Sequence, residues 1–280
     1  MILILTACSV VGNCCGQAGY ADYTDEDLEI WNRCAAILAN KRTLPTGDLI
    51  IETALCLADR PYVASTLEKE PERLIVNLRE LDCTTFVETV VAMALAMKDT
   101  VPSFDTFCLY LQTLRYRNGV INDYTDRLHY FTDWIFENSR KGFVRDMTQA
   151  LGGEPLSLKL SFMSTHPDSY RQLKSQPGRI WTMREKEKEI SLRDGYAMIP
   201  SERIHDCAEG MKSGDIVCFV TNIEGLDVSH VGFVYRQDGV LRLVHASLAG
   251  RKVMIDERPL PVFAAAARSA VGVIIVRIVQ

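Results

Sequence analysis

The hydrophobic residues in the first part of the chain recur with helical spacing. Between residues 83 and 95 the apolar side chains repeat every three or four positions, which predicts a buried helix. Asp82 stands directly before this stretch and is a good N-cap residue, so Cys83 falls at the first position of the helix. The same spacing predicts further helices at residues 24–40, 48–58, 103–117 and 128–139.

The pattern changes in the last part of the chain. Short runs rich in Val, Ile, Leu and Phe are bounded by Gly, Asn and Asp, which is typical of antiparallel strands. These runs are residues 215–220, 230–235, 241–246, 252–256 and 272–279. Helices first and strands last predict an α+β fold.

The pattern between these two parts is mixed. It predicts a strand at residues 156–162 and a short helix near Tyr170. We assign residues 100–204 to an inserted or lateral subregion of a single catalytic domain that spans residues 21–280.

Composition narrows the class of protein. The chain has 280 residues, 48% of them hydrophobic and 24% charged, which is ordinary for a globular protein. The net charge of -5, without a long Lys/Arg cluster, argues against nucleic acid as a partner. Nine cysteines contain no CxxC pair, so zinc-finger and thioredoxin-like sites lose support.

The N-terminus suggests export. Residues 5–8, Leu-Thr-Ala-Cys, have the pattern of a lipoprotein cleavage box, but the segment before them is short and lacks a positively charged start. The true start could lie upstream, the match could be accidental, or cleavage could occur near Ala18. We expect residues 1–20 to be a truncated or disordered export segment, the protein to reside in the cell envelope or periplasm, and Cys8 to be a candidate lipid anchor.

Two histidines stand at one end of a predicted hairpin whose turn lies within residues 237–239. If the loop is the first two of these residues, His230 pairs directly with His245. If it is the last two, His230 pairs with Ser247 and His245 is its diagonal neighbour. In both cases the imidazoles share a face, whereas a three-residue loop without a bulge would separate them.

This pair gives Cys83 a candidate base. A cysteine among apolar residues is usually a small buried hydrophobe, but a helix N-terminus lowers a thiol pKa and favours a nucleophile. His230 would take the thiol proton and later protonate the departing amine, and His245 would hold the His230 ring in position.

The chain resembles the NlpC/P60 superfamily of cysteine peptidases and amidases, and within it the N-acetylmuramoyl-L-alanine amidase-like family. The resemblance to the superfamily rests on four motifs in the family's order: Asp82-Cys83-Thr84-Thr85-Phe86, Ser213-Gly214-Asp215-Ile216-Val217, Ser229-His230-Val231-Gly232-Phe233 and Val244-His245-Ala246. Two further stretches are similar to the amidase-like branch, Arg127 to Trp134 and Ser161 to Pro167.

The resemblance implies a papain-like NlpC/P60 fold, Cys83, His230 and His245 as catalytic residues, peptidoglycan or a muropeptide as substrate, and no metal or cofactor. The bond cut is the amide between N-acetylmuramic acid and L-alanine, or alternatively a D-glutamyl bond within the stem peptide. A peptidoglycan-binding module without catalysis is the hypothesis from another class. Candidate substrate-binding residues are Tyr62, Asp82, Ser229, His129 and His166.

Overall fold

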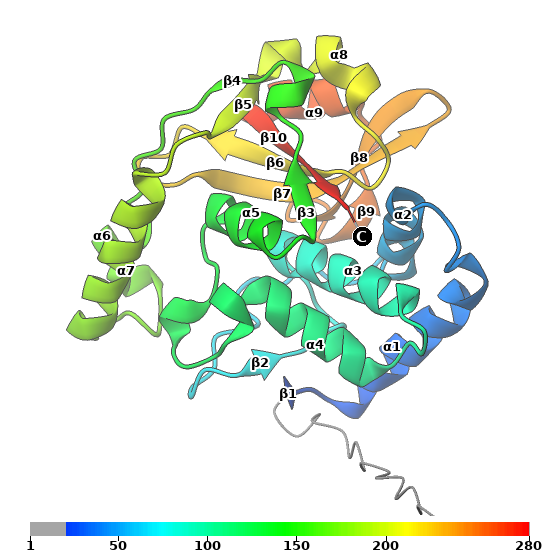
Figure 1. The fold of residues 1–280 in the computed structure, drawn as a ribbon, viewed down its shortest axis with the longest axis horizontal. Helices are drawn as coiled ribbons and strands as arrows, with labels where there is room; N and C mark the ends of the chain where they lie inside the picture. Colours follow the sequence, from blue (N-terminus) through cyan, green and yellow to red (C-terminus); the bar gives the residue numbers. More distant parts are fainter. Residues whose placement is uncertain (1–20, 280) are drawn as a thin grey trace, which may run out of the picture.

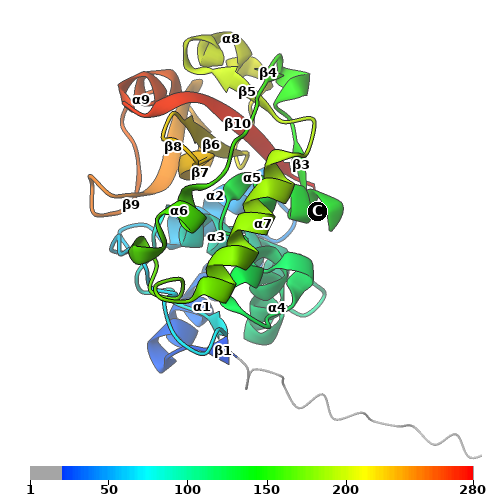
Figure 2. The ribbon, with the colours of Figure 1, turned by 90° about the vertical axis from the view of Figure 1, so that its left-hand side faces the viewer.

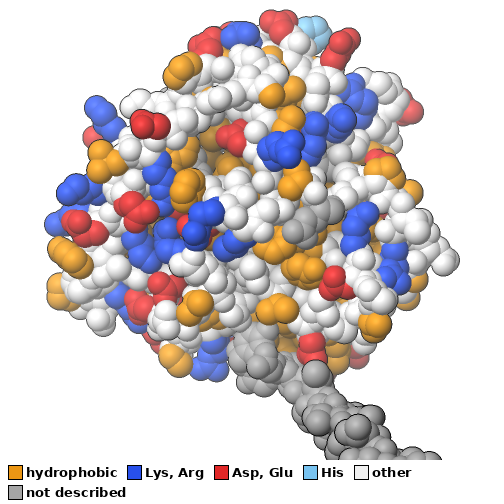
Figure 3. Space-filling model, viewed as in Figure 1, with side chains coloured by type: hydrophobic (Ala, Val, Ile, Leu, Met, Phe, Trp, Pro, Cys, Tyr) orange, Lys and Arg blue, Asp and Glu red, His pale blue; other side chains and the backbone are white. Residues whose placement is uncertain are grey.

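The computed structural model describes residues 21–279. The predicted export segment, with Cys8 and Ala18, lies outside the described residues. None of the helices within residues 21–279 is long and apolar enough to cross a membrane. On the face drawn in Figure 3, Lys and Arg side chains are interspersed with Asp and Glu.

The first half of the chain forms a helical layer (Figure 1). Its helices are α1 (Asp25–Leu38), α2 (Thr46–Cys56), α3 (Cys83–Lys98), α4 (Phe104–Arg115) and α5 (Phe131–Arg140). Helix α5 begins later than the spacing predicted, because the Leu128 N–H bonds to the Arg115 carbonyl before the helix starts. The other predicted helices of this half are confirmed.

The second half supplies an eight-stranded sheet, which confirms the predicted combination of helices and antiparallel strands. Its order is β4 (Glu154–Pro155), β5 (Ala197–Pro200), β10 (Ala270–Ile278), β6 (Ile216–Thr221), β7 (Val228–Gln237), β8 (Val240–Ser247) and β9 (Lys252–Ile255), with β3 (Val144–Asp146) paired to β10. Short strands β1 (Ala21–Asp22) and β2 (Leu74–Ile75) form a separate parallel pair.

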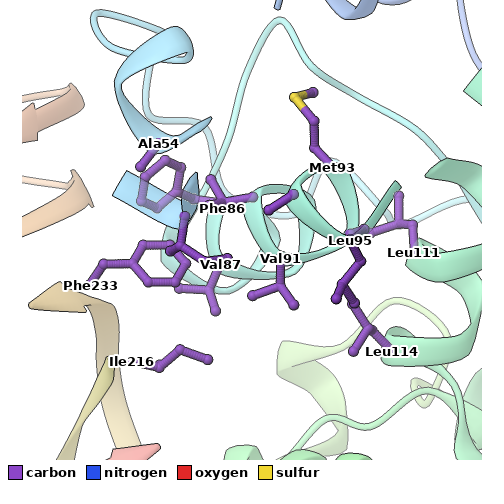
Figure 4. Packing of buried hydrophobic residues seen from close by; sticks show 14 of the residues in the cluster. Ala54, Phe86, Val87, Val91, Met93, Leu95, Leu111, Leu114, Ile216 and Phe233 are labelled. Carbon is purple, nitrogen blue, oxygen red and sulfur yellow. The ribbon is translucent and has the colours of Figure 1, made fainter. Parts of the chain in front are cut away.

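Helix α3 lies at the centre of the main core, between the sheet and the other helices. Figure 4 shows the Phe86 ring beside Phe233 of β7, and Leu95 of α3 beside Leu111 of α4. The two phenylalanine rings meet edge to face, with centroids 5.7 Å apart. Because both faces of α3 are covered by apolar side chains, the helix has little freedom to shift relative to β7.

Short helices cover the opposite face of the sheet. They are α8 (Ile204–Cys207) and α9 (Leu260–Ala266), which pack on a second cluster that includes Phe219, Val234 and Ile275. The spacing analysis did not predict α9, because it is only 7 residues long and carries a proline in its first turn.

Residues 100–204 take part in several layers. Helices α4 and α5 belong to the main core, and β3, β4 and β5 extend the sheet. Helices α6 (Phe162–Thr165) and α7 (Pro177–Ser191) build a third cluster with residues such as Leu158 and Leu160. Figure 2 shows α6 and α7 on the side of the molecule that faces the viewer there.

The predicted strand at residues 156–162 is wrong. Only Glu154–Pro155 pairs as a strand, and α6 already begins at Phe162. The Leu160 N–H bonds to the Ser191 hydroxyl of α7 at 2.9 Å, and the Ser161 N–H bonds to the Gly225 carbonyl at 3.0 Å. Leu158 and Leu160 belong to the third cluster, and the backbone next to them bonds to a side chain of α7 and to the loop at Gly225 instead of to a neighbouring strand. The helix predicted near Tyr170 is a short 3-10 turn at Pro167–Ser169.

Candidate active site

Asp82 sets the position of Cys83. The Thr85 N–H donates to Asp82 Oδ1 at 2.8 Å, and the Asp82 N–H donates to Thr85 Oγ1 at 2.9 Å. This reciprocal capping box satisfies two backbone donors at the start of α3. The predicted cap is therefore confirmed, and Cys83 is the first residue of the helix.

The hairpin between β7 and β8 places the two histidines on one face. Gln237 pairs with Val240, so the loop is Asp238-Gly239, the second of the two predicted alternatives. Both loop residues have positive φ, 51° and 78°, as a tight turn of this kind requires. The rings meet as diagonal neighbours, with His230 Nε2 and His245 Nδ1 2.6 Å apart.

Two backbone features allow this contact. Between its pairings with β6 at Phe219 and Val220, strand β7 has a bulge that contains Ser229, directly before His230. Gly232 lies across from His245, and a Cβ at that position would come within 2.9 Å of the His245 Cβ. A Cβ at position 232 would also come within 2.8 Å of the Val244 carbonyl, so a larger residue there would force β7 and β8 to shift next to His245.

Cys83 lies beside the same strand. The Val231 N–H and the Thr84 N–H and hydroxyl favour the Cys83 thiolate and so act to lower the pKa of Cys83. Val231 directly follows His230 on β7. His245 occupies Nε2 of His230, which leaves Nδ1 as the ring nitrogen able to take a proton from the thiol.

The expectation that the helix N-terminus lowers the Cys83 pKa is wrong for the resting site. Burial and then the negative charge of Asp82 raise the pKa of Cys83 to about 11, against the opposing effect of the Val231 and Thr84 donors. The residue that caps the helix thus also disfavours the thiolate. A neutral thiol at rest needs a base for its activation.

Both histidines are neutral at physiological pH. Burial, and next the charge of His245, lowers the pKa of His230 to about 3. Burial lowers the pKa of His245 to about 4, although Asp256 opposes the shift. A neutral imidazole has a free lone pair, so His230 is able to act as a base over the whole neutral range.

Tyr62 lies close to the sulfur. It forms an isolated bridge with Leu81, immediately before the cap of α3. Burial, followed by the charges of Cys83 and Asp82, raises the pKa of Tyr62 to about 12. Its hydroxyl therefore keeps its proton at neutral pH and is able to donate a hydrogen bond.

A cavity of about 340 Å³ opens beside the start of α3. Asp82 and Thr84, the neighbours of Cys83, line it on one side, and His129, Tyr170 and Arg171 line it on another. Among the predicted substrate-binding residues, the structure brings Asp82 and His129 to this cavity. Ser229 is exposed at the bulge on β7 and is not part of the lining.

The two other histidines among the predicted site residues, His129 and His166, differ in position. The His129 ring nitrogen Nε2 lies 2.9 Å from the Tyr124 carbonyl, and burial, followed by the charge of Arg127, lowers the pKa of His129 to about 3. His166 is exposed, its Nδ1 lies 3.0 Å from the Phe162 carbonyl, and it is outside the cavity lining.

Sequence reasoning missed the charged wall of the cavity. Arg127 is buried and binds Glu68 at 2.8 Å and Glu72 at 2.9 Å. Glu88 of α3 binds the buried Arg115 at 2.6 Å. The sequence analysis named Arg127 only as part of the stretch from Arg127 to Trp134 that is similar to the amidase-like branch. That similarity does not reveal that Arg127 pairs with Glu68 and Glu72.

A larger cavity, about 750 Å³, lies elsewhere, between residues 153–158 and 191–197. None of the predicted site residues lines it. We place the candidate active site at the smaller cavity, because Asp82 and Thr84, the two neighbours of the candidate nucleophile Cys83, line it. Within residues 21–279, no group of His, Cys, Asp or Glu side chains is arranged to hold a metal ion.

Solved structures resemble this chain along most of its length. An N-acetylmuramoyl-L-alanine amidase from Bacteroides uniformis matches with a TM-score of 0.80 and 37% identity, covering 84% of this chain and 99% of that one. A Bacteroides fragilis protein named as a proposed xylanase matches with a TM-score of 0.77 and 39% identity, covering 81% and 99%. A Legionella pneumophila protein with 18% identity and a TM-score of 0.70 shares the fold, covering 91% and 96%.

No curated protein matches the chain. The family model described as N-acetylmuramoyl-L-alanine amidase-like matches residues 53–269, which include Cys83, His230 and His245. The match covers well over half of the chain, and the chain therefore belongs to the N-acetylmuramoyl-L-alanine amidase-like family.

Proposed function

We propose that this protein hydrolyses the amide bond between N-acetylmuramic acid and L-alanine in peptidoglycan or its fragments, with Cys83 as nucleophile. The observation that carries the proposal is the 2.6 Å contact between His230 and His245 on the strand that also contacts the Cys83 sulfur. Membership of the amidase-like family supports the substrate class. A papain-like NlpC/P60 fold is part of the same proposal.

The proposed mechanism starts from a neutral Cys83 thiol and a neutral His230 imidazole. Nδ1 of neutral His230 takes the proton of Cys83, and the sulfur attacks the carbonyl carbon. His230 then gives that proton to the departing amine of L-alanine, and water hydrolyses the resulting thioester. His245 accepts a hydrogen bond from His230 Nε2–H and so stabilises the imidazolium that forms between these steps.

An oxyanion develops on the carbonyl oxygen during the attack. We propose the backbone N–H of Cys83 as a donor to this oxygen, because the first N–H groups of a helix have no partner within the helix. Tyr62 is the candidate second donor, because its hydroxyl keeps its proton up to a pKa of about 12.

The cavity beside Cys83 is the proposed binding site for the group next to the bond. Its volume of about 340 Å³ is within the range of small-molecule sites. Asp82 and His129 belong to its lining, and Ser229 at the bulge would contact substrate on the opposite side of Cys83. His166 takes part only if a long glycan strand extends beyond the cavity.

Cleavage within the stem peptide, between D-glutamate and the diamino acid, is the second candidate function. The same thiol, base and oxyanion donor would serve it. A peptidoglycan-binding module without catalysis is less well supported, since the described site retains a nucleophile and a paired histidine base.

The name of the Bacteroides fragilis relative raises glycoside hydrolysis as another reaction. That chemistry generally needs two free carboxyl groups about 5–9.5 Å apart across the sugar. The carboxylates that line the described cavity are engaged otherwise: Glu68 and Glu88 bind arginines, and Asp82 caps α3. We therefore favour amide hydrolysis.

The decisive experiment is incubation of the protein with purified muropeptides, followed by mass spectrometry of the products. Release of the intact stem peptide with a new L-alanine N-terminus, and of a free muramic acid carboxyl group, is expected. A dipeptide product would instead establish the stem-peptide endopeptidase. Binding without any release would establish the non-catalytic module.

The cell envelope or periplasm is the proposed location, since peptidoglycan lies there. Attachment through a lipid on Cys8 belongs to the same proposal. Fractionation of the cells that produce the protein, with a Cys8→Ser variant as control, tests it: the unchanged chain should appear with membranes and the variant in the soluble envelope fraction.

A further inference from the structure

We propose that Asp256 is a positioning residue whose carboxylate accepts a hydrogen bond from Nε2–H of His245 and thereby fixes the tautomer of that ring. The inference rests on the proposed function, because it assigns a role behind the proposed base. The structure suggests it through one unsatisfied atom and one nearby carboxylate.

The unsatisfied atom is Nε2 of His245. It is buried and has no hydrogen-bond partner within the described part of the chain. Its ring is only 2% exposed, so bulk water does not reach it freely. Leaving a buried N–H without an acceptor is unfavourable, and such an atom normally has a partner.

Asp256 is the carboxylate that faces this atom. Its Oδ2 lies 3.8 Å from His245 Nε2, and its side chain is itself largely buried. Strand β9 determines this position: His245 pairs with Met254, and the Asp256 N–H bonds to the Leu243 carbonyl of β8 at 2.8 Å. Hydrogen bonds at active sites are often long before substrate binds and shorten in the complex.

Arg258 holds this carboxylate in place. Its Nε donates to Asp256 Oδ1 at 2.8 Å and its Nη2 donates to Oδ2 at 2.8 Å. The same guanidinium stacks on the Phe263 ring at 4.8 Å, and Phe263 contacts the edge of His245 with centroids 5.3 Å apart. The Asp256 pKa is lowered by its hydrogen bonds to Arg258, so the carboxylate stays ionised.

The chemistry requires one tautomer of His245. To accept a proton from Cys83, His230 must carry its own proton on Nε2 and a lone pair on Nδ1. Its Nε2–H points to Nδ1 of His245, which must then be the acceptor, and the His245 proton must sit on Nε2. An anionic acceptor at that nitrogen selects this tautomer.

The opposite tautomer would block the reaction. With a proton on Nδ1 of His245, the contact of 2.6 Å could persist only if His230 moved its own proton to the nitrogen that faces the thiol. No net proton passes to Asp256 in the proposed reaction. The thiol proton moves to His230 and from there to the leaving amine, while His245 keeps its Nε2 proton and Asp256 stays ionised.

The charged and titratable groups around His245 are few. His230 of β7 faces Nδ1, and Asp256 and Arg258, which follow β9, face Nε2. Phe263 of α9 supplies an apolar wall. The tautomer of His245 therefore depends mainly on its two neighbours: a neutral histidine at Nδ1 and an anionic carboxylate at Nε2, which favours a proton on Nε2.

The test compares Asp256→Ala with Asp256→Asn in the full chain, using muropeptide turnover per folded protein. The alanine variant should lose about 10–100-fold in kcat with KM unchanged, by analogy with the loss seen when the acceptor behind a metal-binding histidine is removed. The asparagine variant should retain most of the activity, because its amide oxygen still accepts the hydrogen bond.

Asp215→Ala is the matched control. Asp215 is a buried carboxylate that a second arginine, Arg277, binds at 2.7 Å through both oxygens, and it does not contact either histidine of the site. It should change stability without changing kcat. An equal loss of kcat in Asp215→Ala and Asp256→Ala would overturn the positioning role.

A second measurement does not depend on turnover. Nitrogen NMR of protein with labelled histidine should show His245 protonated on Nε2 in the unchanged chain and in Asp256→Asn, and a shift toward Nδ1 in Asp256→Ala. The same tautomer in all three proteins would overturn the inference. Full activity of Asp256→Ala would overturn it as well, whereas turnover by Cys83→Ala would instead overturn the proposed thiol mechanism.

Discussion

The proposed reacting centre and the cavity wall of this protein are built in different ways. Cys83, His230 and His245 lie on a helix start and two neighbouring strands, all part of the main fold. The wall formed by Arg127, His129 and residues 169–171 lies on loops and short turns of the subregion between α4 and β5.

The difference concerns what holds each part in place. Apolar packing and backbone pairing position the reacting centre, whereas ion pairs such as Arg127 with Glu68 and Glu72 position the wall. Regular elements hold reacting groups accurately, and loops vary more easily in the groups that they present. Changes at the centre should therefore affect kcat, and changes at the wall should affect KM or stability.

The largest effect is expected for Cys83→Ala. Without the sulfur no covalent intermediate forms, and muropeptide turnover should fall by about 10⁴-fold or more. Circular dichroism should show unchanged folding, because alanine is compatible with the first turn of a helix. Unchanged turnover in this variant would contradict the nucleophile assignment.

Removal of the Arg127 charge tests whether ion pairs hold the cavity wall in place. Arg127→Met leaves the carboxylates of Glu68 and Glu72 without their partner, and urea unfolding should show a loss of about 3–5 kcal/mol. A triple variant that also carries Glu68→Gln and Glu72→Gln should recover part of this stability, since the orphan charges are gone. No recovery would mean that packing, and not charge pairing, holds the wall.

Alkylation by iodoacetamide should report the raised pKa of Cys83. Because the pKa moves from 9.0 to about 11, the Cys83 thiolate at pH 7 should be about 100-fold rarer than that of an ordinary thiol. Asp82→Asn keeps a good helix cap but removes the negative charge, and should speed the reaction. Peptide mapping identifies the modified cysteine. Equal rates in both proteins would contradict the role of Asp82.

The fall of kcat/KM on the acid side of its pH profile should occur at an unusually low pH. A pKa of His230 lowered from 6.5 to about 3 keeps the base neutral at pH 5, where an ordinary histidine would be about 97% protonated. The neutral fraction of His230 at pH 5 should therefore exceed that of an unperturbed histidine by about 30-fold, and kcat/KM should change little between pH 5 and pH 7. A profile governed only by a group that titrates above the usual cysteine range would contradict the pairing of Cys83 with His230.

The smallest effect is expected at the exposed rim of the wall. Arg171→Ala should raise KM for muropeptides about 3–10-fold with kcat unchanged, because one contact common to ground and transition states is lost. Lys174→Ala removes the same charge three positions further on, outside the cavity lining, and should change neither constant. Equal effects of the two variants would indicate general electrostatic attraction instead of a contact.

The sequence predicted the regular elements of the reacting centre well. The cap at Asp82, the helix from Cys83 and the shared face of His230 and His245 all follow from side-chain types at fixed spacing, and each is confirmed. Whether these residues catalyse remains a prediction. The loop Asp238-Gly239 could not be chosen over its alternative beforehand, because the difference depends on which residues pair across the strands.

Other features could not be predicted, because they depend on contacts between distant segments. The raised Cys83 pKa comes from burial and from the side chain of Asp82, and pattern analysis considered only the helix N-terminus. The cavity wall joins residues around Glu68 to Arg127, a contact between segments far apart in the chain. The false strand at residues 156–162 arose because an alternating pattern can also belong to irregular chain that packs on a helix.

The capping carboxylate at Asp82 has a consequence for the lifetime of the enzyme. Peroxides oxidise the thiolate of cysteine much faster than the thiol, so a sulfur that stays protonated at rest is converted slowly to sulfenic and sulfinic acid. Burial, followed by the negative charge of Asp82, raises the Cys83 pKa, so the resting thiol should resist oxidation by peroxides. The carboxylate that caps the helix thus contributes to the expected resistance of its first residue.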